Sequence, residues 1–380
     1  MKLLITGDLV INQHYSASEK ISPKLKELFA SSNCNIVNLE APVTTSTNKI
    51  IKTGPHLKAN EASTLEVMQA LNIHIAALAN NHIKDYDEQG VLDTIAFCKQ
   101  NDIQPMGAGK NIAEASDYHV LQTNEGNIAV INIAENEWAS ATHSSAGANG
   151  MDVIKDTRCI QKAKQECDLV FVIVHGGHEY YNLPSPRMQE QYRFYAEQGA
   201  DLVVGHHTHC ISGHEVHQGT PIFYSLGNFL FTKPNPNEEW YTGLVLEVNV
   251  NEGKLTTQLH PVGQSKVDFA LTLLSADAKS DVLARVERYS EIICSEDELL
   301  EHWREFILSK KNAYLSHWSP LTFIRNKYIK GVLRRIGMNF SNIAGLSLMF
   351  NLMRCEAHRD ITFEVLNKKL LIGKHDASNI

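Results

Sequence analysis

Three histidines lie within four positions of the chain, directly after a run that has the composition of a buried strand. They are His206, His207 and His209, and they follow the apolar residues 202–204. Each imidazole ring carries a hydrogen-bond donor and an acceptor, and both need partners when the ring is buried. Three such rings at one strand end need something to bind, and a metal ion is the first candidate.

Polar side chains recur at four other points where an apolar run gives way to a turn. These side chains belong to Asp8; to Asn38 and Glu40; to Asn80, Asn81 and His82; and to His175 and His178. Adjacent strand ends meet in one crevice of an α/β sheet, so we expect these side chains to lie together. Carboxylate, amide and imidazole ligands suit divalent manganese, iron or zinc. Because the set holds more ligands than one ion needs, it predicts a two-metal centre of the hydrolytic kind.

The elements that would position these side chains alternate between strand and helix. We expect strands over 2–6, 35–40, 73–82 (with its polar turn), 127–135, 168–177, 201–207, 221–229 and 243–250, and helices over 59–72, 87–102, 157–167 and 185–199. Asn60 and Ser63 are both candidates for the cap of the first helix. This alternation predicts a layered α/β architecture.

Composition limits the class of protein. The chain has 380 residues, of which 43% are hydrophobic and 21% charged, as in soluble globular proteins with more than one folding unit. Its net charge of −8 argues against nucleic acid as a partner. The seven cysteines show no C-x-x-C spacing and indicate reduced thiols. With a start that turns polar at Thr6 and no apolar run long enough to span a bilayer, the sequence predicts a cytoplasmic protein.

The composition of the sequence changes near Ala276, where charge-rich segments of helical period begin. We therefore expect one domain over 1–268 and a helical C-terminal extension over 276–380. Within the extension, the stretch 317–340 has five basic residues between Arg325 and Arg335 and no acidic residue. This pattern predicts either a solvated helix face or a peripheral contact with the inner face of the membrane.

Five motifs, taken together and in order, resemble one protein family. They are "GDL" at 7–9, "NLEAPVT" at 38–44, "LANNHIKDYDEQG" at 78–90, the segment 174–209 that begins "VHGGHEYY" and ends "GHHTH", and "GTPIFYSLGNFLF" at 219–231. Over roughly residues 1–265 the chain resembles the capsule biosynthesis protein CapA family, which is linked to poly-gamma-glutamate capsules. That family looks like a divergent branch of the calcineurin-like metallophosphoesterases. The resemblance implies a layered β-sandwich flanked by helices.

The resemblance also implies roles for individual residues. It makes Asp8 and His209 ligands of a first metal, Asn81, His175 and His207 ligands of a second, and Glu40 the carboxylate that bridges them. His82 would reach the leaving-group oxygen or stabilise charge on the transferring phosphoryl group, and Asn81 and His178 are the other catalytic candidates. The attacking group would be a metal-activated water.

Two departures from the phosphoesterase pattern concern the first metal. Val10 stands where a histidine usually follows the first aspartate, and Glu40 stands where the bridging residue is usually aspartate. Asn12 and His14 are the two candidates to replace the missing ligand.

Two functions remain open from the sequence. The first is a metal-dependent hydrolase that acts on phosphoesters, or on a polymer or lipid-linked intermediate of capsule synthesis. The second is a non-catalytic accessory subunit of a capsule polymer synthase that retains a relic metal site. In both, components of a capsule synthase are the expected partners, and the oligomeric state stays open.

Overall fold

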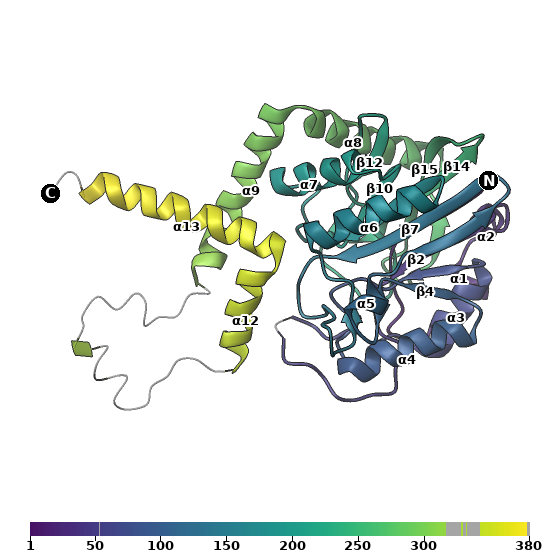
Figure 1. Cartoon of the computed structure of the whole chain (residues 1–380), viewed down its shortest axis with the longest axis horizontal. Helices are drawn as coiled ribbons and strands as arrows, with labels where there is room; N and C mark the ends of the chain where they lie inside the picture. The colour runs from purple at the N-terminus through teal and green to yellow at the C-terminus, as the bar shows by residue number, and fades with distance from the viewer. Residues whose placement is uncertain (53, 317–327, 330–331, 333–342, 378–380) are drawn as a thin grey trace.

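The structure of the chain is a computed structural model that describes residues 1–380 apart from 53, 317–327, 330–331, 333–342 and 378–380 (Figure 1). The strands are β1 Lys2–Val10, β2 Cys34–Leu39, β3 Ile75–Ala77, β4 Gln104–Met106, β5 Ala108–Gly109, β6 His119–Thr123, β7 Gly126–Ala134, β8 Gly147–Ala148, β9 Leu169–His175, β10 Leu202–His206, β11 His214–His217, β12 Thr220–Phe223, β13 Asn228–Phe231, β14 Thr242–Asn251, β15 Lys254–Gln264 and β16 Leu271–Leu273. The helices are α1 Ala17–Lys20, α2 Pro23–Ala30, α3 Glu61–Ala70, α4 Asp87–Gln100, α5 Ile112–Ala115, α6 Val153–Glu166, α7 Pro186–Glu197, the 3₁₀ turn η1 Glu238–Tyr241, α8 Ala276–Cys294, α9 Glu296–Ser316, α12 Ile343–Arg354 and α13 Glu356–Ala377.

Two large sheets carry the fold. The first has the order β16-β15-β14-β1-β2-β3-β4, with β13 also paired to β1. The second has the order β11-β12-β10-β9-β7-β6. The strands β1, β2, β3 and β4 run parallel, as do β7, β9, β10 and β12. Each sheet therefore has a set of carboxyl strand ends at one edge.

The two sheets pack face to face because their strands alternate between two apolar layers. Leu3 and Ile5 of β1 lie in one buried cluster with Phe171 and Ile173 of β9. Leu4 points the other way, into a cluster that includes residues of α2, α3 and α4. A third cluster joins β7, β9 and β10 to α6 and α7. The order helix, sheet, sheet, helix confirms the expected layered α/β sandwich flanked by helices (Figure 1).

Local signals in the sequence explain where several helices begin. The side chain of Asn60 accepts a hydrogen bond from the backbone N–H of Ser63, so Asn60 is the cap of α3. Ser185 caps α7 in the same way, with proline as the first helical residue. These two caps fix helices that flank the two sheets.

One predicted strand was wrong. The run 221–229 forms two strands, because β12 ends at Phe223 and β13 begins at Asn228 in the other sheet. Between them Gly227 has a φ of +66°, a conformation that favours glycine. The turn carries the chain from the second sheet to the first, where β13 pairs in parallel with β1.

The C-terminal helices begin where the sequence predicted them, and α8 starts at Ala276. This helix packs on β11 and β15, and its Val282 and Val286 belong to the cluster between the sheets. The helices α9, α12 and α13 build a smaller cluster around Trp303 and Ile361 and lie to one side of the sandwich (Figure 1). The division into a domain over 1–268 and an extension over 276–380 stays a prediction, and α8 contributes to the core of the sandwich.

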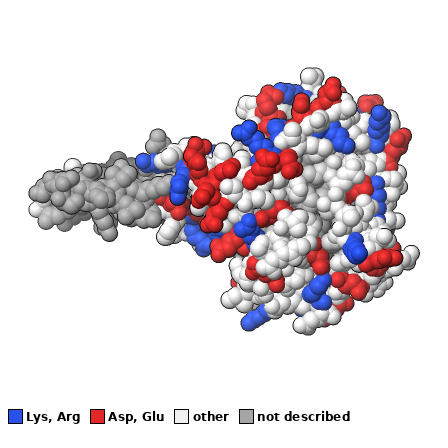
Figure 2. All heavy atoms as spheres, turned by 90° about the horizontal axis from the view of Figure 1, so that it is seen from above, with Lys and Arg blue, Asp and Glu red and all other residues white. Residues whose placement is uncertain are grey.

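The surface mixes both signs of charge. Figure 2 shows Lys and Arg side chains interspersed with Asp and Glu over one face of the molecule. Among the described residues no helix combines the length and the apolar character needed to cross a bilayer. Most of the basic stretch 317–340 lies outside the described residues, so its membrane contact stays a prediction.

Candidate metal centre

The candidate ligands lie together where the carboxyl strand ends of the two sheets meet. They are Asp8 near the end of β1, Glu40 directly after β2, Asn81 in the turn after β3, His175 at the end of β9, and His207 and His209 after β10. A hydrogen bond crosses from one sheet to the other, with 3.1 Å between Nδ2 of Asn38 and Nδ1 of His175. The pairing of the sheets therefore assembles the site.

A first group consists of Asp8, Glu40 and His209, whose ligand atoms all lie within 4.8 Å of one another. Nδ1 of His209 lies 3.3 Å from Oδ2 of Asp8 and 3.8 Å from Oε2 of Glu40. Asn38 donates a hydrogen bond of 2.6 Å to the other Asp8 oxygen. Asn228 Oδ1 lies 3.0 Å from His209 Nδ1, so β13 orients this ring.

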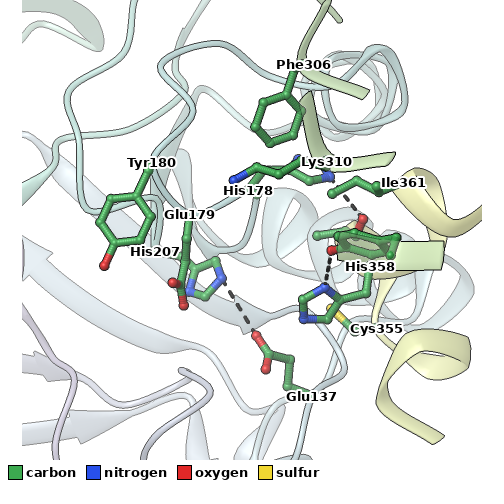
Figure 3. A pocket seen from close by; sticks show the side chains of 13 residues that line it. Glu137, His178, Glu179, Tyr180, His207, Phe306, Lys310, Cys355, His358 and Ile361 are labelled. Carbon is green, nitrogen blue, oxygen red and sulfur yellow. Dashed lines mark hydrogen bonds and ion pairs between the residues drawn. The ribbon is translucent and has the colours of Figure 1, made fainter. Parts of the chain in front are cut away.

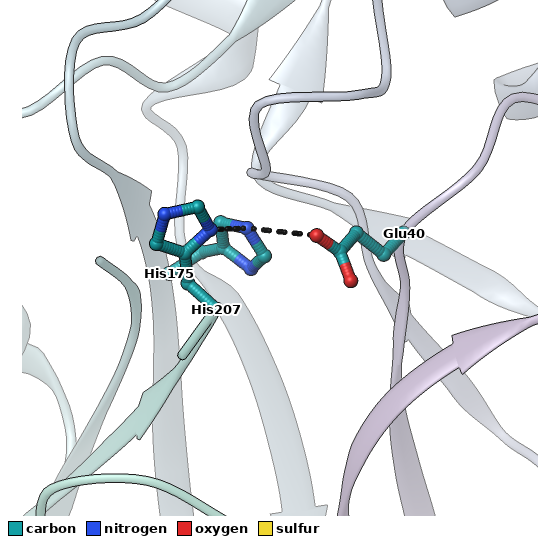
Figure 4. Close-up of side chains that lie close together, drawn as sticks. All are labelled: Glu40, His175 and His207. Atoms are coloured by element: carbon teal, nitrogen blue, oxygen red, sulfur yellow. Dashed lines mark hydrogen bonds and ion pairs between the residues drawn. The ribbon is translucent and has the colours of Figure 1, made fainter. Parts of the chain in front are cut away.

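A second group consists of Glu40, His175 and His207 (Figure 4). Nε2 of His175 lies 3.4 Å from Oε1 of Glu40 and 3.0 Å from Nδ1 of His207. Oδ1 of Asn81 lies 3.1 Å from the same His175 nitrogen. Glu40 belongs to both groups, one oxygen facing each, which is the arrangement that a bridging carboxylate would have.

Several buried oxygens at the centre lack hydrogen-bond partners among the described residues. They are Oδ2 of Asp8, Oδ1 of Asn38 and both carboxylate oxygens of Glu40. A buried carboxylate without partners is strongly destabilising, whereas a cation between such oxygens removes the penalty. The donor set of carboxylate oxygens, an amide and imidazoles therefore fits divalent cations.

The titration of these groups points to the same conclusion. Burial and the neighbouring Asp8 carboxylate raise the pKa of Glu40 well above its usual value. Burial and the adjacent His207 lower the pKa of His175 well below its usual value. Burial opposes the charge of His209, but the carboxylates of Glu40 and Asp8 outweigh it and raise the pKa of His209 to about 10. The carboxylates of Glu40 and Asp8 thus favour a positive charge between them.

The turn after β10 is held in an uncommon backbone conformation. His207 has a φ of +89° and His209 a φ of +56°, a region that non-glycine residues rarely enter. Residues held in such conformations cluster at functional sites, where the surrounding structure fixes them. Here the turn directs both imidazoles into the centre, while His206 points away and lies 2.8 Å from the backbone oxygen of Thr6.

His82 is buried at the rim of the second group and contacts two charged side chains. Its Nδ1 lies 2.7 Å from Oδ2 of Asp85 and 3.1 Å from Nζ of Lys52. Burial and the Lys52 charge lower the pKa of His82, and the Asp85 carboxylate opposes them. Both of these contacts use Nδ1, and neither uses Nε2.

His178 is near the cleft but faces the C-terminal helices. Its Nε2 lies 2.9 Å from the backbone oxygen of Ala357, and its ring packs edge-on against Trp303 and Phe306 at 4.9 and 5.7 Å between ring centroids. The catalytic role expected for His178 stays a prediction. The contacts give this ring a structural use as well, because it anchors α9 and α13 beside the site.

No neighbour in the sequence supplies the histidine ligand that the phosphoesterase pattern leads us to expect at position 10. Val10 is buried and pairs with Phe231 of β13. Asn12 is exposed and accepts a hydrogen bond from the Thr232 hydroxyl at 2.9 Å, and His14 is exposed. Neither candidate therefore enters the first group.

Two residues beside the candidate ligands were missed by sequence reasoning. Glu137 accepts a hydrogen bond of 3.3 Å from Asn81 and lies 3.7 Å from Nε2 of His207. It follows β7 by three residues, so it carried the same strand-end signal as the others. Lys52 carried no comparable signal, because it lies in a long loop far from any strand end.

A pocket of about 290 Å³ opens beside the second group (Figure 3). His207, Glu137 and Glu179 line it from the sandwich. Residues of α9 and α13, among them Lys310 and His358, line it from the other side. The C-terminal helices therefore form one wall of the space next to the candidate metal centre.

Two solved structures match the chain at low similarity. A phosphatase from Mycoplasma pneumoniae, described as novel, covers 69% of this chain with 93% of its own length, at a TM-score of 0.44 and 14% sequence identity. A hypothetical protein from Thermus thermophilus matches with the same TM-score and identity, over 69% of this chain and 99% of its own. Similarity at this level says nothing about the activity of this chain.

Sequence comparison is more informative. The chain is 33% identical to the PGA biosynthesis protein CapA of Bacillus subtilis (strain 168) over 236 residues, which are 59% of this chain and 62% of that protein. It is 31% identical to the capsule biosynthesis protein CapA of Bacillus anthracis over 252 residues, with coverages of 61% and 60%. The match thus spans about three-fifths of these curated relatives. Residues 2–233 also match the family described as "Bacterial capsule synthesis protein PGA_cap", and the chain belongs to this family of bacterial capsule synthesis proteins.

Proposed function

We propose that the chain is a metal-dependent hydrolase of phosphoesters that works in the synthesis of a capsule or exopolymer. The observation that supports this most is Glu40, which lies in both ligand groups and has no hydrogen-bond partner on either oxygen among the described residues. A pair of divalent ions, of the manganese, iron or zinc class, is the proposed cofactor. Bound there, such ions would acidify a water molecule and polarise a phosphoryl oxygen.

The residues of the chain would divide the work as follows. Asp8, Glu40 and His209 would hold one cation, and Glu40, Asn81, His175 and His207 the other. Asn38 and Asn228 would orient ligands through their hydrogen bonds to Asp8 and His209. The pocket wall would exclude bulk water from the substrate and strengthen the electrostatic contacts inside.

We assign His82 to the leaving-group oxygen. With Nδ1 donating to the Asp85 carboxylate, Nε2 is the nitrogen that would face the substrate. When the ring carries a proton, the Asp85 carboxylate stabilises the imidazolium, and the proton passes from Nε2 to the departing oxygen. His82 therefore acts on the reacting atoms, and Asp85 is a positioning residue.

His82→Ala separates this role from metal binding. Because the ring contributes proton transfer or charge stabilisation, the turnover of a phosphodiester probe should fall about 10²- to 10⁴-fold. The metal content of the variant should stay at the wild-type level, since His82 lies in neither ligand group. A parallel loss of metal and turnover would make His82 a ligand and refute the assignment.

A specific observation favours a second candidate, a non-catalytic accessory subunit of a capsule polymer synthase. The buried Val10 takes the place of a ligand, and neither Asn12 nor His14 replaces it. In this case the metals would stabilise the fold and the relic centre would not turn over substrate. Fully metal-loaded protein that hydrolyses no phosphomonoester, phosphodiester or lipid-linked phosphate would favour this function.

The partners and the location of the protein follow from the same proposal. We propose that the chain works with components of a capsule polymer synthase, in the cytoplasm or at the inner face of the membrane. The support is family membership and the basic stretch 317–340 of the sequence.

A further inference from the structure

A third group of ligand atoms adjoins the proposed two-metal centre, and its Glu137 also contacts Asn81 and His207. Glu137, Cys355 and His358 each offer one ligand atom, and the three atoms lie within 4.8 Å of one another (Figure 3). We propose that this group is a separate site for a zinc-type divalent cation, which joins the sandwich to the C-terminal helices. Glu137 comes from the turn after β7, whereas the other two residues come from the start of α13.

Cys355 and His358 are placed as a chelating pair. Cys355 directly precedes α13, and His358 is three residues further on, so both side chains lie on one face of the helix. Cys355 is buried at 1% exposure. Burial raises the pKa of the Cys355 thiol well above its usual value, and a hydrogen bond from the backbone amide of His358 opposes this shift. A cation that binds the sulfur would displace the proton.

The histidine of the pair is held in position by a second residue. The hydroxyl of Tyr314 lies 2.7 Å from Nδ1 of His358. This contact fixes the ring and leaves Nε2 for a cation. Metal-binding histidines are commonly oriented in this way, by a hydrogen bond to the ring nitrogen that does not bind the metal.

The carboxylate of Glu137 completes the group with a negative charge. The Arg354 guanidinium packs over the rings of Trp138 and Phe350 and forms no ion pair with Glu137 in the described part of the chain, although the two charges attract each other at longer range. Thiolate, imidazole and carboxylate together are the ligands of zinc sites, and a water would take the fourth position. The adjoining pocket gives a cation access from solvent.

Neighbouring contacts hold the start of α13 against the sandwich, beside Glu137, without the cation. Asp360 accepts a hydrogen bond of 2.7 Å from Nε of Arg187, and Glu356 accepts one of 2.8 Å from the backbone N–H of Asn136. The cation would add a bond across the same junction. Its binding would therefore stabilise the docking of α13 beside the candidate metal centre.

Cobalt(II) substitution of the full chain tests the proposal directly. A cobalt–thiolate bond absorbs in the near ultraviolet, and neither of the two groups at Glu40 contains a cysteine. Cobalt-saturated wild-type protein should show this charge-transfer band and should bind one cobalt equivalent more than Cys355→Ser. Wild-type protein saturated with cobalt that shows no such band would overturn the proposal, whatever the variants do.

Matched variants locate the band and separate this site from the proposed hydrolase. Cys294→Ser, which removes the exposed cysteine of α8, should keep the band. His358→Gln should weaken the band, and this variant tests the site if Cys355→Ser fails to fold. His209→Ala should keep the band but lose an ion of the first group. The cation site at Cys355 and the two-metal centre can therefore be refuted independently of each other. A band that survives in Cys355→Ser, or equal cobalt content in that variant and wild type, would also refute the site.

Discussion

At the scale of single residues, the carboxylate of Glu40 decides what the centre can do. It is fully buried, and each of its oxygens faces a different histidine, His175 or His209. Burial raises its pKa, so the ionised carboxylate is unfavourable on its own. A cation nearby would stabilise the ionised form. The protonation of His82 likewise depends on a neighbouring charge, because burial lowers its pKa and the Asp85 carboxylate opposes that shift.

Asp85→Asn should change the pH profile of the proposed reaction. The Asp85 carboxylate opposes the burial that lowers the pKa of His82, so its removal should lower that pKa further. If protonated His82 serves the leaving group, activity falls as pH rises through this pKa, and the alkaline limb of kcat should move to lower pH. Asp102→Asn, which removes the same charge from an exposed turn, should leave the limb in place. An unmoved limb in Asp85→Asn would mean that His82 is not the titrating group.

The sequence could predict most of the residues that meet at the centre. Asp8, Glu40 and the histidines stand at strand ends, and parallel strand ends converge. Asp85 and Lys52 could not be predicted as partners of His82, because the loop that carries Lys52 has no periodic pattern. The preference for His207 over His206 depended on the turn after β10, and its positive φ angles are set by tertiary contacts.

At the scale of elements, Asp8 is positioned at the point where β1 crosses the turn before β13. The backbone N–H of Asp8 donates to the oxygen of Gly227 at 3.0 Å. Gly7 lies against the same oxygen, and a Cβ at position 7 would come within 2.0 Å of it. Close approach of two backbones thus requires glycine at this position.

Gly7→Ala should destabilise the fold and disturb the first ligand group. The backbones would have to separate, and we expect a loss of about 3 kcal/mol in the free energy of unfolding. Urea denaturation measures this loss. Gly219→Ala meets no heavy atom within 4 Å and suffers only from its φ of +91°, so it should lose about 1 kcal/mol. Equal losses in the two variants would show that the crossing tolerates a side chain.

The contact of His178 with α13 should make stability depend on pH. Burial, followed by the charge of Arg187, lowers the pKa of His178 to about 3 in the folded chain, against 6.5 for the free side chain. Between these values the unfolded chain binds a proton that the folded chain does not, so stability falls as pH falls. From pH 6.5 to pH 5 the wild type should lose about 1.5 kcal/mol more than His178→Gln, which cannot titrate. Identical pH dependence in urea denaturation would contradict the buried neutral ring.

The elements themselves were predictable where a pattern was long and regular. The ends of the helices α3, α4, α6 and α7 lie at most four residues from their expected positions. The split of 221–229 could not be foreseen, because an apolar run does not show that its two halves pair in different sheets. The short strand β3 pairs for only three residues, and its neighbours rather than its composition place it.

At the scale of the whole molecule, two sheets and a helical extension meet around one cleft. The first sheet brings carboxylates, the second brings histidines, and α9 and α13 close the side of the adjoining pocket. The cleft therefore depends on the packing of the sandwich and on the docking of the extension. Neither packing is visible in any single motif of the sequence.

Metal content of the purified full chain tests the central claim most directly. The double variant His207→Ala/His209→Ala removes one ligand from each group that shares Glu40. Elemental analysis after reconstitution with manganese or zinc should show about two divalent ions fewer per chain than in the wild type, since each group loses an imidazole donor that its ion needs. The paired variant His214→Ala/His217→Ala, which alters two histidines of β11 outside the centre, should bind as many ions as the wild type. An unchanged ion count in the His207/His209 variant would contradict the account.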